Sequence, residues 1–265
     1  MLSKNEIKDI KALGQKKFRD ERRLFVVEGE KLVDEALQSG YDVVARYRVE
    51  DIGEETMARI SQLTHPSPAL AVVRMPSDDA IPDTLTLDPD ELVLALDGIR
   101  DPGNLGTILR IADWFGIHRV IASEDTVDCY NPKVVQATMG AIFRVRLHYC
   151  DLTFQLQSMM DCVAAGGNSG REHFSASGTK YQSSEAIPVY GTFLDGENIY
   201  QMELSKGGVI VMGSEANGIS AEVAAAVTHR LFIPPFPHDA HTSESLNVAV
   251  ATAITCAEFR RQAAR

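Results

Sequence analysis

The sequence predicts an α/β protein in which a small N-terminal α/β unit precedes a larger parallel β-sheet covered by helices. Two observations predict this class. Continuous apolar runs such as ELVLAL and GGVIVMG alternate with amphipathic stretches after residue 91, as strands buried on both faces do. Residues 76–91 are rich in proline and aspartate and lack an amphipathic period, which predicts a linker. We therefore divide the 265 residues into domains at 1–75 and 92–265.

The first unit begins with a helix over residues 3–17, because its apolar positions recur at helical spacing. Ser3 and Glu6 match a capping box at its start. The elements that follow are a strand at 24–29, a helix at 30–40, a strand at 41–49, a helix at 57–63 and a strand at 70–75. Gly40 is expected to end the second helix.

The second unit alternates strands and helices to the end of the chain. The predicted strands are residues 91–99, 118–123, 143–149, 188–194, 207–213 and 230–235. The predicted helices are residues 106–116, 131–143, 151–167 and 245–262. Asn104 is expected to cap the first of these helices, and Ser243 or Ser245 the last. Residues 167–184 are polar and rich in glycine and serine, and we expect a mobile loop there.

The composition is that of an ordinary globular protein, with 45% hydrophobic and 24% charged residues. The sequence has no run of 18 apolar residues, so no transmembrane helix is predicted. The N-terminus lacks the apolar region of a secretory signal, and we therefore expect a cytoplasmic protein. The four cysteines are scattered and are expected to be reduced thiols. His238 and His241 lack the companions of a zinc site, so no metal is expected.

The net charge of −11 argues weakly against nucleic acid as a partner, but the charge is unevenly distributed. Residues 1–23 hold eight Lys or Arg against four acidic residues. Lys16, Lys17, Arg22 and Arg23 are candidate RNA contacts, and the alternative is the solvated face of a helix.

Three motifs follow strands of the second unit. The first, DGIRDPGNLGTILRIADWFG at 97–116, outlines a phosphate-binding loop but matches neither the dinucleotide nor the P-loop pattern. At 100° per residue, Ile108, Ile111, Ala112 and Phe115 share one helix face, and Arg110 and Asp113 share the other. The simplest interpretation of Arg110 is therefore a surface residue near Asp113.

The second motif, GGVIVMGSEANGIS at 207–220, is a buried strand that ends at Gly213. Ligands of open α/β sheets bind at the carboxyl ends of strands, and Gly213 would permit a close backbone approach to one. The alternative is an ordinary turn in which the Glu215 carboxylate lies near a helix N-terminus, where a negative charge is stabilising. In the third motif, residues 231–255, three prolines precede Ser245-Leu246-Asn247 at the start of a helix.

Taken in order, these three motifs closely resemble those of the SpoU (TrmH) branch of the SPOUT superfamily, RNA 2′-O-ribose methyltransferases, over residues 92–260. Residues 3–37 are similar to the ribosomal-protein-like substrate-binding domain of many of these enzymes. The resemblance implies a C-terminal trefoil knot, a homodimer, an RNA substrate (rRNA or tRNA) and S-adenosylmethionine as cofactor.

The resemblance also implies roles for residues of the three motifs. Arg110 would be the principal catalytic residue, and the residues that position it and the substrate would be Asn104, Glu215, Ser245 and Asn247. The cofactor-binding residues would be Thr192, Phe193, Leu194, Gly213, Glu215, Gly218, Ile233 and Leu246. A guanidinium is a poor general base, so Arg110 is expected to stabilise the developing alkoxide and to bind a phosphate.

Two features depart from the family pattern, and three alternatives remain. The segment between Pro234 and Ser245 is longer than usual and lacks glycine, and the loop at 167–184 is also long. The alternatives are a base-methylating SPOUT enzyme, a non-catalytic RNA-binding protein of the same fold, and a nicotinamide dehydrogenase. The missing dinucleotide motif argues against the last.

Overall fold

A computed structural model describes residues 2–77, 87–88, 90–164, 173–174, 180–181, 187–237 and 245–264, without the side chains of residues 160–186. Most of the predicted linker and of the 167–184 loop, and His238, His241 and Ser243, lie outside these residues. Two compact units are present. Unit 1 contains Met1–Asp79, Asp101–Arg110 and Val127–Val145, and unit 2 contains Ala80–Arg100, Ile111–Thr126 and Arg146–Arg265. The domain boundaries at 75 and 92 remain a proposal.

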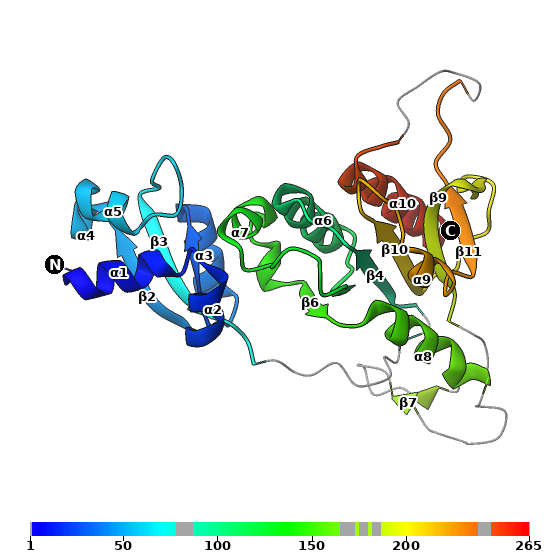
Figure 1. Ribbon diagram of the computed structural model, residues 1–265, viewed down its shortest axis with the longest axis horizontal. Helices are drawn as coiled ribbons and strands as arrows, with labels where there is room; N and C mark the ends of the chain where they lie inside the picture. Colours follow the sequence, from blue (N-terminus) through cyan, green and yellow to red (C-terminus); the bar gives the residue numbers. More distant parts are fainter. Residues whose placement is uncertain are drawn as a thin grey trace. The chain divides into compact units, whose positions relative to one another are not determined.

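Unit 1 is built on an antiparallel sheet with the order β1-β3-β2 (Figure 1). Its strands are β1 (Leu24–Glu28), β2 (Val43–Arg48) and β3 (Ala69–Arg74). Its helices are α1 (Lys4–Ala12), α2 (Lys16–Arg22), α3 (Glu30–Gln38), α4 (Val49–Ile52), α5 (Glu54–Ile60), α7 (Pro132–Thr138) and the 3₁₀ turn η1 (Ala141–Phe143). The capping box of Ser3 and Glu6 is confirmed.

Two helix predictions in unit 1 were too long. The helix predicted over 3–17 ends at Ala12, and α2 begins at Lys16 after a turn. The helix predicted over 131–143 ends at Thr138, because Met139 (φ 50°) and Gly140 (φ 97°) adopt left-handed conformations. A side chain at Gly140 would also meet the Glu35 carboxylate at 2.4 Å, so this position requires glycine.

Within unit 1, residues of the 127–145 segment contact the N-terminal sheet and helices. Arg19, only 2% exposed, pairs with Asp128 and donates to the Leu13 carbonyl at 2.9 Å. Two aromatic contacts accompany this pair: Phe25 lies 4.7 Å from Tyr130, and Tyr41 meets Phe143 edge-on at 5.1 Å, between ring centroids. The segment is therefore anchored by both apolar and ionic contacts.

Unit 2 contains a six-stranded sheet with the order β11-β9-β10-β4-β5-β6, and all of its strand pairs are parallel. Its strands are β4 (Leu92–Asp97), β5 (Arg119–Ala122), β6 (Arg146–Tyr149), β9 (Val189–Asn198), β10 (Gly208–Gly213) and β11 (His229–Phe232). The helices that lie wholly in this unit are α8 (Leu152–Ala164), α9 (Ala221–Ala224) and α10 (Val248–Ala263), and a short β7-β8 pair joins His173–Phe174 to Lys180–Tyr181. The predicted parallel sheet is confirmed.

Helices cover both faces of this sheet. Residues of α8 and α9, including Leu156 and Val223, form an apolar cluster with Val209 and Val211 of β10. Tyr190 points to the opposite face, because side chains alternate along β9, and its ring contacts Phe259 of α10 at 4.9 Å. The carboxyl ends of the strands therefore remain available for a site.

The helix caps differ from those predicted. Helix α6 (Pro102–Trp114) begins at Pro102, so Asn104 lies inside its first turn and the predicted cap is wrong. Asp101 takes that position and accepts from the Asn104 amide at 2.8 Å, since proline is favoured just after the cap. In α10, Asn247 caps the helix by accepting from the Ala249 and Val250 amides, so the prediction of Ser245 is also wrong.

Candidate functional site

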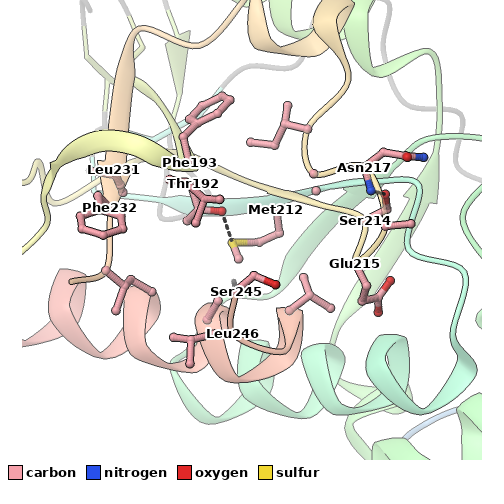
Figure 2. A pocket seen from close by; sticks show the side chains of 18 of the residues that line it. Thr192, Phe193, Met212, Ser214, Glu215, Asn217, Leu231, Phe232, Ser245 and Leu246 are labelled. Atoms are coloured by element: carbon pink, nitrogen blue, oxygen red, sulfur yellow. Dashed lines mark hydrogen bonds between the residues drawn. The ribbon is translucent and has the colours of Figure 1, made fainter. Parts of the chain in front are cut away.

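A cavity of ≈ 1000 Å³ lies in unit 2 at the carboxyl ends of β9, β10 and β11 (Figure 2). Its lining comes from three chain segments and the start of α10. The sequence-predicted residues that line it are Thr192, Phe193, Leu194, Gly213, Glu215, Gly218, Ile233, Ser245 and Leu246. Segments more than 50 residues apart in the chain thus meet around one space. Their binding roles stay predictions.

The first wall is a bulge in β9. Arg230 of β11 pairs with Gly191, whereas the next residue, Leu231, pairs with Glu197, so five residues of β9 leave the ladder. The extruded residues 192–196 include three that line the cavity. At the far end of the bulge, a Cβ on Gly196 would lie 2.6 Å from the Leu231 backbone, so glycine permits this close crossing.

The second wall is the turn after β10. Ser214 and Gly218 exchange backbone hydrogen bonds of 3.0 and 2.9 Å, which close the turn around Glu215 (Figure 2). Gly213 is buried, and a Cβ there would meet the Gly218 carbonyl carbon at 2.1 Å. The close backbone approach expected at Gly213 is therefore made by this turn of the protein itself.

The third wall joins β11 to α10. Residues 231–236 run from the end of β11 along the cavity, and Ser245 and Leu246 meet it from the start of α10. The Asn247 side chain caps α10, and Asn247 does not line the cavity. Its position one residue beyond Leu246 fixes how the chain enters the helix.

The cavity is mainly apolar, with few polar side chains. Its floor includes Met212, whose sulfur lies 3.9 Å from the Thr192 hydroxyl (Figure 2). Leu194, Phe236 and Leu246 are 70%, 93% and 47% exposed and form an apolar rim. Among the described residues that line the cavity, Glu215 is the one with an acidic side chain. Such a lining suits a small molecule with an apolar ring and a positive charge.

Asn104 and Arg110 lie on the part of α6 that belongs to unit 1. Arg110 is exposed, as the helical spacing predicted, and it makes no hydrogen bond or ion pair within the described part of the chain. Leu105, Ile108, Leu109 and Ala112 form the buried side of α6, whereas Ile111 and Phe115 are only half-buried. The predicted apolar face did not include Leu109, which is fully buried.

The four predicted RNA contacts lie on α2 or directly after it. Lys16 pairs with Asp20 and Arg22 with Asp9, both at 2.7 Å, and the Arg23 guanidinium donates to the Pro76 carbonyl at 2.7 Å. Lys17 is exposed. Exposed ion pairs contribute only ~0.2–1 kcal/mol each, so a phosphate could replace either carboxylate.

Several cavity residues were not predicted from the sequence. These are Met212, Ser214, Ala216, Asn217, Ile219, Leu231, Phe232, Pro234, Pro235, Phe236, Val248 and Ala251. Many of them adjoin a predicted residue, so the strand-end positions were the available signal. Pro234, Pro235 and Phe236 were not named singly, but they lie in the segment from Ile233 to Leu246 that the family resemblance predicts as a cofactor loop.

The remaining sequence expectations concern metals, thiols and membranes. Within the described residues, no group of histidine, cysteine and carboxylate side chains could hold a metal ion. Cys129, Cys150 and Cys256 form no disulfide with another described residue. No helix found in the described ranges is long and apolar enough to cross a membrane.

Comparison with known proteins identifies the family. The model of the SpoU rRNA Methylase family matches residues 91–257, and that of the MRM3-like substrate binding domain matches residues 4–65. The chain belongs to the SpoU rRNA methylase family. The first match contains all three sequence motifs and every residue that lines the cavity. The SpoU-type fold predicted from the motifs is thereby confirmed, apart from the knot.

Individual relatives cover nearly the whole chain. The 23S rRNA (guanosine(2553)-2′-O)-methyltransferase RlmP of Bacillus subtilis is 29% identical, and the alignment covers 97% of each chain. A TrmH-family structure from Porphyromonas gingivalis is 37% identical and covers 99% of each chain, with a TM-score of 0.78. An AdoMet-bound rRNA methyltransferase from Sinorhizobium meliloti is 29% identical, covers 98% of this chain and 97% of its own, and has a TM-score of 0.75.

Proposed function

We propose that this SpoU-family protein transfers a methyl group from S-adenosylmethionine to a ribose 2′-hydroxyl of ribosomal RNA. One observation carries the proposal: the second and third motifs, together with residues 192–194, line a single cavity at the carboxyl ends of β9, β10 and β11. The B. subtilis relative supports this, because its name specifies 2′-O-methylation of 23S rRNA.

The cavity fits S-adenosylmethionine. Cofactor pockets commonly occupy about 300–1,000 Å³ and combine apolar walls with a few polar groups. The rim formed by Leu194, Phe236 and Leu246 suits the purine ring. The Glu215 carboxylate, in the turn beneath, is a counter-charge for a cationic ligand. The AdoMet-bound relative from S. meliloti supports the same ligand.

S-adenosylmethionine, when bound, would supply a methyl group whose bond to a positively charged sulfur breaks as the bond to the ribose oxygen forms, and the residues lining the cavity would hold it. The protein must orient the hydroxyl and accommodate the charge that develops on its oxygen as the proton leaves. We assign Arg110 to this charge, because its exposed guanidinium makes no bond with another described residue. The proton passes to a phosphate oxygen or to water, since a guanidinium stays protonated.

The other predicted catalytic residues have supporting roles in this proposal. Asn247 caps α10, and Asn104, in the first turn of α6, would position Arg110 and the substrate. Ser245 and Glu215 lie at the cavity itself and would contact the ligands. Unit 1 would bind the RNA through Lys16, Lys17, Arg22 and Arg23, as the MRM3-like substrate binding domain match suggests.

We also propose a homodimer in the cytoplasm and a trefoil knot in unit 2. The exposed apolar side chains of unit 2 support the dimer, foremost Trp114, which is 84% exposed. Burial of such surface is the main favourable term in association. Residues 238–244, on which the proposed knot depends, lie outside the described residues.

The proposed function is tested by mapping 2′-O-methyl groups across the ribosomal and transfer RNAs of a strain that lacks the gene. We expect one rRNA ribose methyl group to disappear and to return with the intact gene but not with the variant Arg110→Ala. A methyl group lost from a base, or from tRNA, would overturn the assignment of ribose or of rRNA, respectively. RNA binding without transfer of a labelled methyl group would favour a non-catalytic protein.

A further inference from the structure

Arg230 holds the extruded segment of β9 from outside the cavity. Its guanidinium carbon lies 3.5 Å from the centroid of the Phe193 ring, within the range of a cation–π interaction. Its Nη2 atom donates to Oδ1 of Asp195 at 2.5 Å. One side chain therefore engages two of the five extruded residues.

The place of Arg230 in the sheet explains why it can do so. Its backbone pairs with Gly191, the last residue of β9 before the bulge, and the register resumes at Leu231 and Glu197. Its side chain therefore begins beside the first residue of the bulge and reaches Phe193 and Asp195. Phe193 contacts Arg230 and also lines the cavity, so the position of its ring affects both.

Apart from the Arg230 contacts, the side chains of residues 192–196 make few hydrogen bonds within the described part of the chain. Leu194 is 70% exposed, and the Thr192 hydroxyl makes only a weak contact with the Met212 sulfur. The hydrogen bond from Arg230 lowers the pKa of the Asp195 carboxyl, so this carboxylate stays charged and paired at neutral pH. A segment that must be ordered before it binds a ligand loses affinity through the entropy of ordering.

We propose that Arg230 is a positioning residue that pre-orders residues 192–195 for the cofactor. This inference rests on the proposed function, because it takes S-adenosylmethionine as the ligand of the cavity. Arg230 does not line the cavity, so it acts through Phe193 and Asp195. Position 230 favours arginine over lysine, because only a planar guanidinium can stack on the Phe193 ring while it pairs with the Asp195 carboxylate.

The test measures binding of S-adenosylmethionine by calorimetry and its KM and kcat in methyl transfer to rRNA from cells lacking the gene. For Arg230→Ala we expect the Kd and the KM for S-adenosylmethionine to rise on the order of tenfold, about 1.4 kcal/mol. The kcat at saturating cofactor and the unfolding temperature should stay unchanged. Arg230→Lys should restore about a third of the loss, because it keeps the charge without the stacking plane.

A matched control is Arg74→Ala, which removes an exposed ion pair with Asp42 in unit 1 and should leave cofactor affinity unchanged. The variants Phe193→Leu and Arg230→Ala should be non-additive, since each removes the same ring contact. An unchanged Kd in Arg230→Ala would overturn the inference, as would a higher KM for RNA alone. Failure of the wild-type protein to bind S-adenosylmethionine would instead overturn the proposed function.

Discussion

The buried ion pair between Arg19 and Asp128 predicts a large loss of stability when either charge is removed alone. Arg19 is 2% exposed and Asp128 13% exposed, so both charges are largely withdrawn from water. Removal of one partner from such a pair costs about 3–5 kcal/mol, because the other charge stays buried without compensation. The free energy of unfolding of a folded domain is only about 5–15 kcal/mol, so this loss of stability is easily measured.

The two single variants should differ. In Asp128→Ala the guanidinium keeps only the Leu13 carbonyl, and its Nε atom already has no partner among the described residues. We therefore expect the full cost of about 3–5 kcal/mol. In Arg19→Met the Asp128 carboxylate keeps the Tyr130 amide at 2.9 Å and some solvent, so the cost should be smaller, about 2–3 kcal/mol.

The assay is a double-mutant cycle followed by urea unfolding, with hydrogen exchange in α2 and residues 127–131 as the local measurement. The double variant leaves no buried charge, so its loss should be smaller than the sum of the single losses by at least about 1 kcal/mol. Additive losses, or a cost below about 1 kcal/mol for Asp128→Ala, would refute the assignment of this pair as the anchor of the 127–145 segment.

Three further predictions concern the cavity, the dimer and the thiols. Gly213→Ala places a methyl group 2.1 Å from the Gly218 backbone, so it should destabilise the protein by about 1–3 kcal/mol and weaken S-adenosylmethionine binding in calorimetry; wild-type affinity would contradict the account of the turn. Trp114 is the single tryptophan of the chain and is 84% exposed. Its fluorescence should shift to shorter wavelength as the protein concentration rises through the dimer range, and an invariant spectrum together with a dimeric mass would exclude it from the interface. Burial, and to a smaller extent the nearby charges of Asp151 and Glu124, raise the pKa of the Cys150 thiol from its ordinary value of 9.0 to about 11. At pH 8 its thiolate fraction, and hence its alkylation rate measured on its peptide by mass spectrometry, should be about a hundredfold below that of an ordinary thiol. Because this pKa is raised in the folded state, its contribution to stability should be present below pH ~9 and be lost as the pH rises toward ~11; rapid alkylation at pH 8 would contradict the burial.

The architecture of unit 2 was predictable because its central strands β4 and β10 are continuous apolar runs. Val209, Ile210 and Val211 are fully buried in β10, as the run GGVIVMG predicted. The loops after β10 and β11 were also predictable, since each follows a strand and carries a motif, whereas residues 192–194 were named only through the family resemblance. Unit 1 followed the same rule for its strands, but its short helices depend on left-handed residues such as Met139, which carry no sequence signal.

Features that depend on tertiary contacts could not be predicted. The bulge at residues 192–196 arises from how β11 registers against β9, and no local pattern reports that register. The sequence did not distinguish Asp101 from Asn104 as the N-cap of α6, because aspartate and asparagine have the same preference for that position. The pairing of Arg19 with Asp128 joins residues 109 apart, so a helix pattern alone indicates an ordinary surface arginine.

We propose that this chain transfers a methyl group to a ribose of rRNA with Arg110 at the reacting oxygen. The most direct measurement is transfer of labelled methyl from S-adenosylmethionine to rRNA from cells lacking the gene, followed by location of the label in digested nucleosides. We predict label on a single ribose 2′-oxygen, loss of transfer in Arg110→Ala with cofactor binding unchanged, and appreciable transfer in Arg110→Lys. Label on a base, or undiminished transfer by Arg110→Ala, would contradict the account.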